Sequence, residues 1–294
     1  MITEKIETNN WKENGYSSPR HHYYWHFRSY PEFLAECKST HGSSHTNEDS
    51  WTGGASYPQA VQLAQTGWPE GTAKVKKFSG ELIEEIKSQI VRDEIVYDVE
   101  GVDFDLPRVL EGEPEAWIKF EENHTVGNTG RKIIKLVFNG AANCNVSSSE
   151  MIAKGAAAAA LIELLELAGH RVEVILSYGV YENGNYFFPR ITIKEPDQFL
   201  DIDKLAFTLA HPAAFRRLYF SFAESRPDDL PDKMGVGSGY GSTTNMLDKD
   251  RGDIYIPGGD LGFDENELKK AENWILKNLS SQGVQIKMKE KSNP

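Results

Sequence analysis

Histidines near the N-terminus are the first candidates for chemistry. His21, His22 and His26 fall within six residues, and His41 and His45 have the i, i+4 spacing of a zinc-binding helix. The surroundings of His41 are rich in Ser and Gly and lack the Glu of a His-Glu-x-x-His motif, which favours a loop. The aromatic residues beside His21 could stack nucleic-acid bases, although such a patch more often packs within a protein.

Carboxylates alternate in a second cluster, formed by Asp98, Glu100, Asp103 and Asp105. This cluster could bind a cation, but an acidic strand edge that discourages pairing with another strand is the commoner explanation. Combined with the three histidines at 21–26, it supports one functional hypothesis, a metal-dependent enzyme or a nucleic-acid-processing factor.

A glycine-rich run at 235–241 superficially resembles a nucleotide-binding loop. The dinucleotide-binding version needs a strand immediately before it and a helix immediately after it, and the flanking residues fit neither. We therefore predict a surface loop. The sequence also lacks a Ser nucleophile elbow, a phosphate-binding loop and paired cysteines. It contains no constellation that is typical of catalysis.

The elements that would position a site are clearest in the second half of the chain. Residues 132–138 form an apolar run typical of a buried strand, and the capping box at 147–150 predicts a long helix that ends near Gly169. Further strands are predicted at 171–176, 188–193 and 253–256, and helices at 201–224 and 264–281. Strands that alternate with helices indicate an α/β fold, a mostly parallel sheet with helices on both faces.

Ligands of such sheets bind at the carboxyl ends of the strands. The loops expected there follow the strands that end near residues 138, 176 and 256. The candidate binding residues in these loops are Asn139, Asn143, Ser147, Ser149, Tyr178 and Asp260.

The first 130 residues show a different pattern. Short helices are predicted near 31–37 and from Ser56 to about residue 66, and another at 79–92, followed by short extended runs around residues 95 and 118. Glycines at 127 and 130 suggest a boundary near residue 130. We thus expect an α+β extension at 1–130 and an α/β domain at 131–294, which could still share one core.

The order of elements from 133 to 175 resembles the opening of a von Willebrand factor A domain. It comprises a strand, an Asn- and Ser-rich loop, a long Ala-rich helix and a second strand. The whole chain is similar to a family of tailed-bacteriophage proteins that carry such a domain behind an N-terminal extension, in the segments 51–71, 112–115 and 254–260. The resemblance implies a three-layer, Rossmann-like α/β domain.

Domains of this kind bind a divalent cation through an Asp-x-Ser-x-Ser motif after the first strand. The matching positions here read Asn139-x-Ala141-x-Asn143, so the anionic ligand is missing. Mg²⁺ prefers carboxylate and water oxygens, so the resemblance implies a degenerate metal site. Asn139, Ser147 and Ser149 are the weak metal candidates, and Asp260 could help to rebuild a site. We expect no cofactor, with a divalent cation as the alternative.

Composition limits the partners and the compartment. With 44 acidic and 32 basic residues, the net charge of −12 opposes binding to nucleic acid or to anionic membranes. Two cysteines in unrelated contexts, Cys37 and Cys144, indicate a reducing compartment. The sequence shows no signal peptide and no membrane segment. We therefore predict a protein of the host cytoplasm.

These observations favour a protein-interaction module without catalysis. A phage or host protein would contact the loops at 139–149, 178–186 and 258–262, with help from the aromatic arm at 21–30. The metal-dependent enzyme or nucleic-acid-processing factor is the first alternative. The second alternative is an acidic inhibitor that imitates nucleic acid and blocks a host DNA-binding protein.

Overall fold

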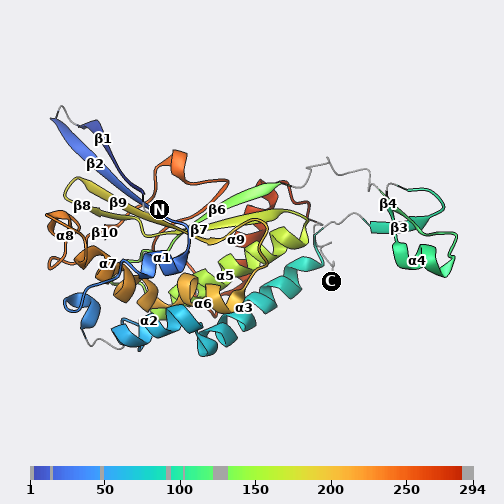
Figure 1. Cartoon of the computed structure of the whole chain (residues 1–294), viewed down its shortest axis with the longest axis horizontal. Coiled ribbons are helices and arrows are strands. Elements are labelled where there is room, and N and C mark those ends of the chain that lie inside the picture. The colour runs from blue at the N-terminus through green and yellow to red at the C-terminus, as the bar shows by residue number, and fades with distance from the viewer. Residues whose placement is uncertain are drawn as a thin grey trace, which may run out of the picture.

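The computed structural model describes residues 3–13, 16–46, 50–90, 94–101, 103–121 and 132–286 (Figure 1). It confirms a mixed α/β fold. The strands are β1 (Thr3–Glu13), β2 (Tyr16–Phe27), β3 (Glu94–Asp98), β4 (Asp103–Phe104), β5 (Trp117–Glu121), β6 (Ile133–Asn139), β7 (Arg171–Ser177), β8 (Val180–Glu182), β9 (Asn185–Lys194), β10 (Ser242–Thr243) and β11 (Ile254–Ile256). The helices are α1 (Tyr30–Leu34), η1 (Ser43–His45), α2 (Tyr57–Thr66), α3 (Pro69–Lys87), α4 (Leu106–Glu111), α5 (Ser148–Leu167), α6 (Ile202–Ala210), η2 (Ala214–Tyr219), α7 (Phe220–Glu224), α8 (Leu230–Lys233), η3 (Asp248–Asp250) and α9 (Leu268–Ser281).

The main sheet has the strand order β1-β2-β9-β7-β6-β11, and β8 and β10 extend it beside β9. Parallel pairs join β6 to β7, β6 to β11 and β2 to β9. Strand β9 runs antiparallel to β7, because the short β8 hairpin returns the chain without a crossover helix. The sheet is therefore mixed, and its parallel strands β6, β7 and β11 carry the candidate loops.

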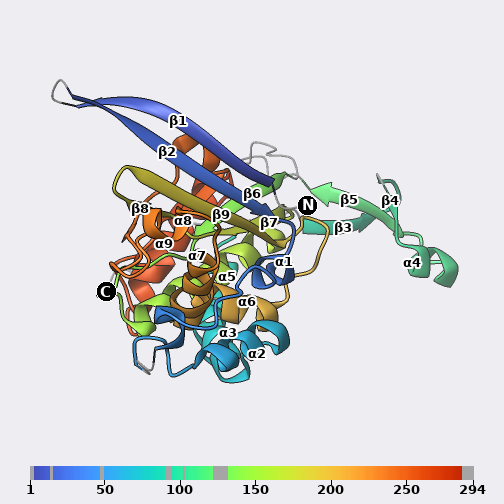
Figure 2. The same cartoon turned by 60° about the vertical axis from the view of Figure 1, so that its left-hand side comes forward.

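Helix α5 packs directly beneath the sheet, and α3, α6 and α9 pack around it on the same side (Figures 1 and 2). Small residues permit this close packing: a Cβ atom added at Gly155 would lie 2.6 Å from Cβ of Ala210. The alanines at 156–160 are almost completely buried. The Ala-rich run thus has the packing role that its small side chains predict.

The opposite face of the sheet is covered by the segment that contains η3. Met246 packs there against Val137, Ile175 and other apolar residues of the sheet. The carboxylate of Asp250 accepts hydrogen bonds from Tyr24 and from Arg190, at 3.2 and 3.1 Å. In the described part of the chain this face carries a short 3-10 helix rather than α-helices. The three-layer arrangement that the von Willebrand A resemblance implies is not confirmed.

The two halves of the chain meet in one sheet and one apolar core. The aromatic run at 21–27 lies in β2, which pairs with β9 over seven residues. Trp25 and Phe27 of β2 belong to the same buried cluster as Leu176 of β7 and Leu161 of α5. The predicted boundary near residue 130 falls within 122–131, outside the described residues.

Helix α3 begins ten residues earlier than predicted. The sequence Gly67-Trp68-Pro69 ends α2, but Pro69 also occupies the first turn of α3, where a missing N–H costs nothing. Ser56 caps α2 with a reciprocal capping box to Gln59, and Ser147 caps α5 in the same way with Glu150. The capping residues of α2 and α5 were thus correctly predicted, whereas the start of α3 at Pro69 was not.

Strands β3, β5 and β4 form a separate three-stranded antiparallel sheet that carries α4 (Figures 1 and 2). We call residues 94–121 the small sheet unit. In both views it stands apart from the main sheet and its helices. Within the described residues, no helix is both long enough and apolar enough to cross a membrane.

Candidate functional site

A cavity of about 290 Å³ lies beside the loop that follows β6. We call it the strand-end pocket, because it occupies the edge of the sheet where parallel strands commonly present ligand-binding loops. Aromatic side chains and backbone of the glycine-rich loop form much of its wall. Its lining residues are Trp51, Ala142, Asn143, Cys144, Val180, Phe215, Phe220, Gly239, Tyr240, Gly241, Ser242 and Thr243.

Asn139, the last residue of β6, is fully buried below this pocket and joins three segments. Its side-chain oxygen accepts hydrogen bonds from the backbone N–H groups of Ala141 and Gly179, at 3.2 and 2.9 Å. Its amide nitrogen donates to the carbonyl oxygen of Thr244 at 2.8 Å and to the hydroxyl of Tyr255 at 3.2 Å. An amide supplies both donors and acceptors here, which a carboxylate could not do. Asn139 therefore acts as a structural connector.

A lysine side chain bonds the backbone of Asn139, which was predicted as a weak metal candidate. Nζ of Lys154, from α5, donates to the backbone oxygens of Asn139, Pro257 and Gly259 at 2.8, 2.5 and 2.9 Å. Burial lowers the pKa of Lys154 to about 7, and the nearby Asp260 carboxylate acts in the opposite direction. The Lys154 side chain thus bonds three carbonyl oxygens, at the end of β6 and in the segment after β11.

The other predicted site residues each have their own contacts. Ser147 caps α5, and Ser149 lies half-buried in the first turn of that helix. Asp260 accepts a hydrogen bond from the backbone N–H of Gly262 at 2.7 Å. Tyr178 is fully buried, and burial raises its pKa. Of the predicted residues, only Asn143 lines the pocket, where its side-chain oxygen accepts from the N–H of Thr243 at 3.0 Å.

A π-helix, η2, places a buried arginine behind the pocket. Arg216 is 1% exposed, and its guanidinium donates to the backbone oxygens of Trp51, Asn143 and Val146 at 2.6, 3.1 and 2.7 Å. Burial lowers the pKa of Arg216 to about 10, an effect that the Cys144 thiol partly offsets. π-Helical turns are rare and are frequently found at functional sites.

Arg217, the next residue of η2, bonds the segment that precedes α2. Arg217 donates to the backbone oxygens of Ala55 and Ser44, both at 3.0 Å, and lies 3.4 Å from the hydroxyl oxygen of Thr52. Both arginines therefore hold Ser44 and the segment 51–55, including Trp51, against the strand-end loops. Neither arginine was among the predicted site residues. The available signal was a pair of arginines inside the apolar run 213–223.

Two buried N–H groups near the pocket find no acceptor in the described part of the chain: Nε1 of Trp51 and Nε of Arg216. The guanidinium carbon of Arg216 lies 4.7 Å from the centroid of the Trp51 ring. The exposed thiol of Cys144 belongs to the same pocket. The site therefore combines unused donors, a guanidinium charge and a thiol.

The glycine-rich loop closes one side of the pocket and is anchored by Tyr240. The Tyr240 ring stacks on Phe220 with centroids 3.8 Å apart, and its hydroxyl donates to Glu224 at 2.5 Å. Burial raises the pKa of Tyr240 to about 12. Tyr240 has a φ of 61°, in the left-handed region, between Gly239 and Gly241, which also have positive φ. The run thus forms the predicted loop, and its backbone forms part of the pocket.

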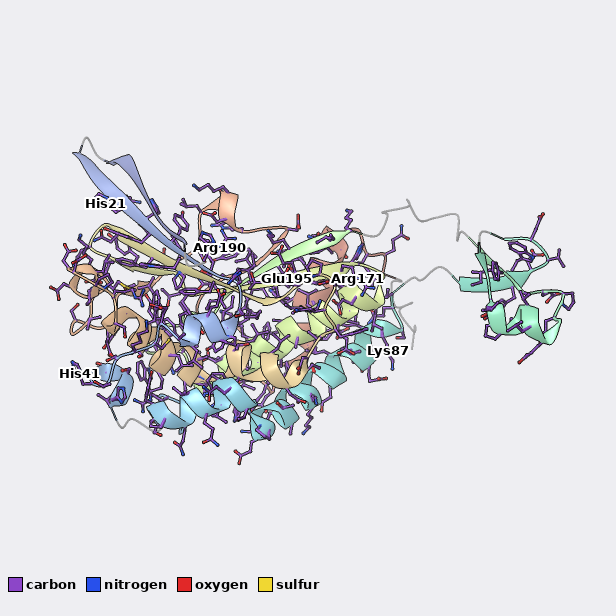
Figure 3. The ribbon with its side chains drawn as sticks, viewed as in Figure 1. His21, His41, Lys87, Arg171, Arg190 and Glu195 are labelled. Carbon is purple, nitrogen blue, oxygen red and sulfur yellow. The ribbon has the colours of Figure 1, made fainter. Side chains whose placement is uncertain are left out.

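The N-terminal histidines and the acidic cluster lie elsewhere. His22 is buried and stacks on Tyr186 with centroids 4.7 Å apart, whereas His26 is exposed. Figure 3 places His21 on β2 and His41 in a separate loop before η1. The carboxylates at 98–105 belong to the small sheet unit. Among the residues that the structure describes, no three His, Cys, Asp or Glu side chains form a group that could hold a metal ion.

Comparison with known sequences finds one family. The sequence model of a domain of unknown function, DUF7192, matches residues 5–284. No curated protein matches the chain. No solved structure matches it.

Proposed function

The chain belongs to the DUF7192 family, a domain of unknown function, and we propose from the geometry of the strand-end pocket that it is a binding protein. The pocket would receive a carboxylate-bearing side chain of a protein partner. The observation that carries this proposal is the pair of buried donors, Trp51 Nε1 and Arg216 Nε, that find no acceptor among the described residues. A buried donor without a partner costs about 1–3 kcal/mol, and an entering oxygen would recover that free energy.

The charge around the pocket supports an anionic group. Arg216 is buried, and its guanidinium donates to the backbone oxygens of Trp51, Asn143 and Val146. These carbonyl groups solvate its charge without neutralising it. A carboxylate that displaced water beside Arg216 would form a charge-assisted hydrogen bond, which is stronger than a neutral one. This local positive charge contrasts with the net charge of −12 of the whole chain.

The size and lining of the pocket favour binding over chemistry. A cavity of about 290 Å³ is at the lower limit for small-molecule sites and suits one or two side chains. Cys144 is a potential nucleophile, but the lining contains no imidazole or carboxylate that could act as its base. We therefore propose that the partner contacts the strand-end loops at this pocket, with Trp51 and Arg216 as its main residues and Cys144 in the pocket wall.

The origin and location of the protein stay predictions. The resemblance to von Willebrand A domains, the source in a tailed bacteriophage and the host cytoplasm as location all derive from the sequence. The proposed pocket depends on none of them. A phage or host protein with an exposed Asp or Glu side chain would fit it equally well.

Peptide selection with a blocked pocket tests the proposal. A random library of short peptides is selected on wild-type protein, and the selected peptides are then measured against protein whose Cys144 carries N-ethylmaleimide. We expect Asp or Glu in the selected peptides and at least about tenfold weaker binding to the blocked protein. The variant Cys144→Ser, treated with the same reagent, should bind like the untreated protein. Selected peptides without an acidic residue, or binding that blocking leaves unchanged, would overturn the proposal.

A further inference from the structure

The small sheet unit exposes an unusual share of the apolar surface. Ten large apolar residues are exposed among those described, and six of them lie between positions 99 and 117. Single exposed apolar residues are common on protein surfaces, but a cluster of them in one short segment more often marks a binding surface. The six residues and their exposed fractions are Val99 64%, Phe104 47%, Leu106 55%, Val109 45%, Leu110 78% and Trp117 41%.

Helix α4 carries half of these residues on one side. Leu106, Val109 and Leu110 have the i, i+3, i+4 spacing that places side chains on one helix face. Arg108 lies on the opposite face, where its guanidinium carbon is 3.8 Å from the centroid of the Tyr97 ring of β3. The stacked Arg108 thus holds α4 on the sheet, and the apolar stripe faces away from that contact.

A cross-strand pair forms a second apolar surface on the other face of the small sheet, because Trp117 alternates with Ile118, the partner of Tyr97. Phe104 of β4 and Trp117 of β5 are direct partners in the antiparallel register, so their side chains share one face of the sheet. Their ring centroids are 5.9 Å apart. Asp105 caps α4 by accepting from the N–H of Arg108 at 3.2 Å, which fixes the helix directly after Phe104.

The charge of the unit determines what can cover this surface. Residues 94–121 contain nine acidic and two basic residues, a net charge of −7, which leaves −5 of the chain's −12 to all other residues. Glu111 is the last residue of α4, and Glu113 and Glu115 come after it; all three are exposed, and Glu113 forms an ion pair with Arg108 at 2.9 Å. A second copy of the unit, an anionic membrane and the acidic main body would all be repelled. A segment that is both basic and apolar would be attracted by the negative charge of the unit and by its exposed apolar residues.

We propose that the small sheet unit is a docking surface for a basic amphipathic segment of another protein. Leu106, Val109 and Leu110 would contact the apolar face of that segment. Its Lys or Arg residues would pair with the carboxylates at the end of α4 and after it. Such ion pairs increase the specificity and the rate of association, and they weaken as the salt concentration rises. This surface is separate from the strand-end pocket, so each proposal can fail without the other.

Calorimetry with designed peptides tests the docking surface on the full chain. The first probe is a synthetic helical peptide of about 15 residues with leucines at i, i+3, i+4 and i+7 and lysines elsewhere. The second has the same composition in scrambled order, which removes the apolar face. We expect the first peptide to bind at least about tenfold more tightly than the second, and its affinity to fall at high salt.

Matched surface variants locate the binding. Leu110→Ser and the double change of Glu111→Gln and Glu115→Gln should each weaken binding by about tenfold, and the second should also reduce the salt dependence. Phe199→Ser is the control, because Phe199 is 92% exposed but lies outside the unit. Circular dichroism confirms that each variant is folded. Equal binding of both peptides, or equal binding by Leu110→Ser and wild type, would overturn the proposal. Self-association of the chain that Leu110→Ser abolishes, or tight binding to neutral lipid vesicles, would also overturn it.

Discussion

Nζ of Lys154 donates a hydrogen bond to the backbone oxygen of Asn139 across 2.8 Å, so a side chain of α5 reaches the end of β6, the strand beside the edge strand β11. The same nitrogen bonds the carbonyl oxygens of Pro257 and Gly259, from the segment after β11. This arrangement joins the ends of β6 and β11 through a positive charge. A divalent cation at this position would meet an ammonium in place of a carboxylate.

Metal titration is the first prediction. Below the pKa of Lys154, calorimetric titration of the wild-type protein with Mg²⁺, Ca²⁺ or Mn²⁺ should give no saturable heat, because the Lys154 ammonium then repels a second cation and Asn139 uses its oxygen on two backbone N–H groups. Stoichiometric binding that Asn139→Ala or Ser147→Ala removes would contradict this account and revive the metal site.

The second prediction concerns the connecting role of Asn139. Replacement by Ala leaves the N–H groups of Ala141 and Gly179 and the carbonyl oxygen of Thr244 without their partner. We expect the free energy of unfolding to fall by about 3 kcal/mol, measured by urea denaturation. Asn273→Ala, at an exposed position of α9, should change it by less than about 0.5 kcal/mol. A similar small effect at Asn139 would show that the loops do not depend on it.

Acid sensitivity through His211 is the third prediction. Burial lowers the pKa of His211 to about 4, and its Nδ1 accepts a hydrogen bond from the N–H of Ala213 at 3.0 Å. The unfolded chain, with an ordinary pKa of about 6.5, therefore binds a proton more readily than the folded chain. The contribution of His211 to the free energy of unfolding is fully present above the unfolded pKa of about 6.5. It is lost as the pH falls toward 4, the folded pKa.

The variant His211→Asn isolates this contribution, because the Asn oxygen can replace Nδ1 as acceptor but does not titrate. Urea denaturation of both proteins at several pH values between about 7 and about 4 should show wild type losing about 3 kcal/mol relative to the variant. Parallel pH profiles for the two proteins would rule out His211 as a source of acid sensitivity.

The fourth prediction compares two helical glycines. At Gly155 in α5, an added Cβ would lie 2.6 Å from Cβ and 2.8 Å from Cα of Ala210, so Gly155→Ala should force α5 and α6 apart. We expect a loss of about 1–3 kcal/mol in the free energy of unfolding. At Gly80 in α3, an added Cβ meets no atom within 4 Å, so Gly80→Ala should stabilise by up to about 1 kcal/mol. Equal effects at both sites would contradict the close contact of α5 with α6.

Local sequence signals predicted the elements around the pocket well. The apolar run before Asn139 and the capping box at Ser147 correctly placed β6 and the start of α5. The positions of the strand-end loops followed from the parallel order of these elements. These features could be predicted because each depends on residues that are near one another in the chain.

Features that depend on distant partners could not be predicted in this way. The pairing of β2 with β9 and the π-helix around Arg216 have no local sequence pattern that distinguishes them from an arm and an ordinary helix. The role of Lys154 was also hidden, because a lysine on a helix is normally solvated, and only the tertiary fold brings the three carbonyl groups to it.

The pairing of β2 with β9 also affects how the chain folds. His21 pairs with Asn185 and Phe27 with Ile191, so these partners lie 164 positions apart. During synthesis, β2 emerges long before the strand beside which it will lie. Pairing across such a separation carries a large loop-closure cost and is intrinsically slow. Until β9 arrives, the Trp25 side of the hairpin lacks its final neighbours, which makes this early strand the part of the newly made chain with the greatest need for protection from aggregation.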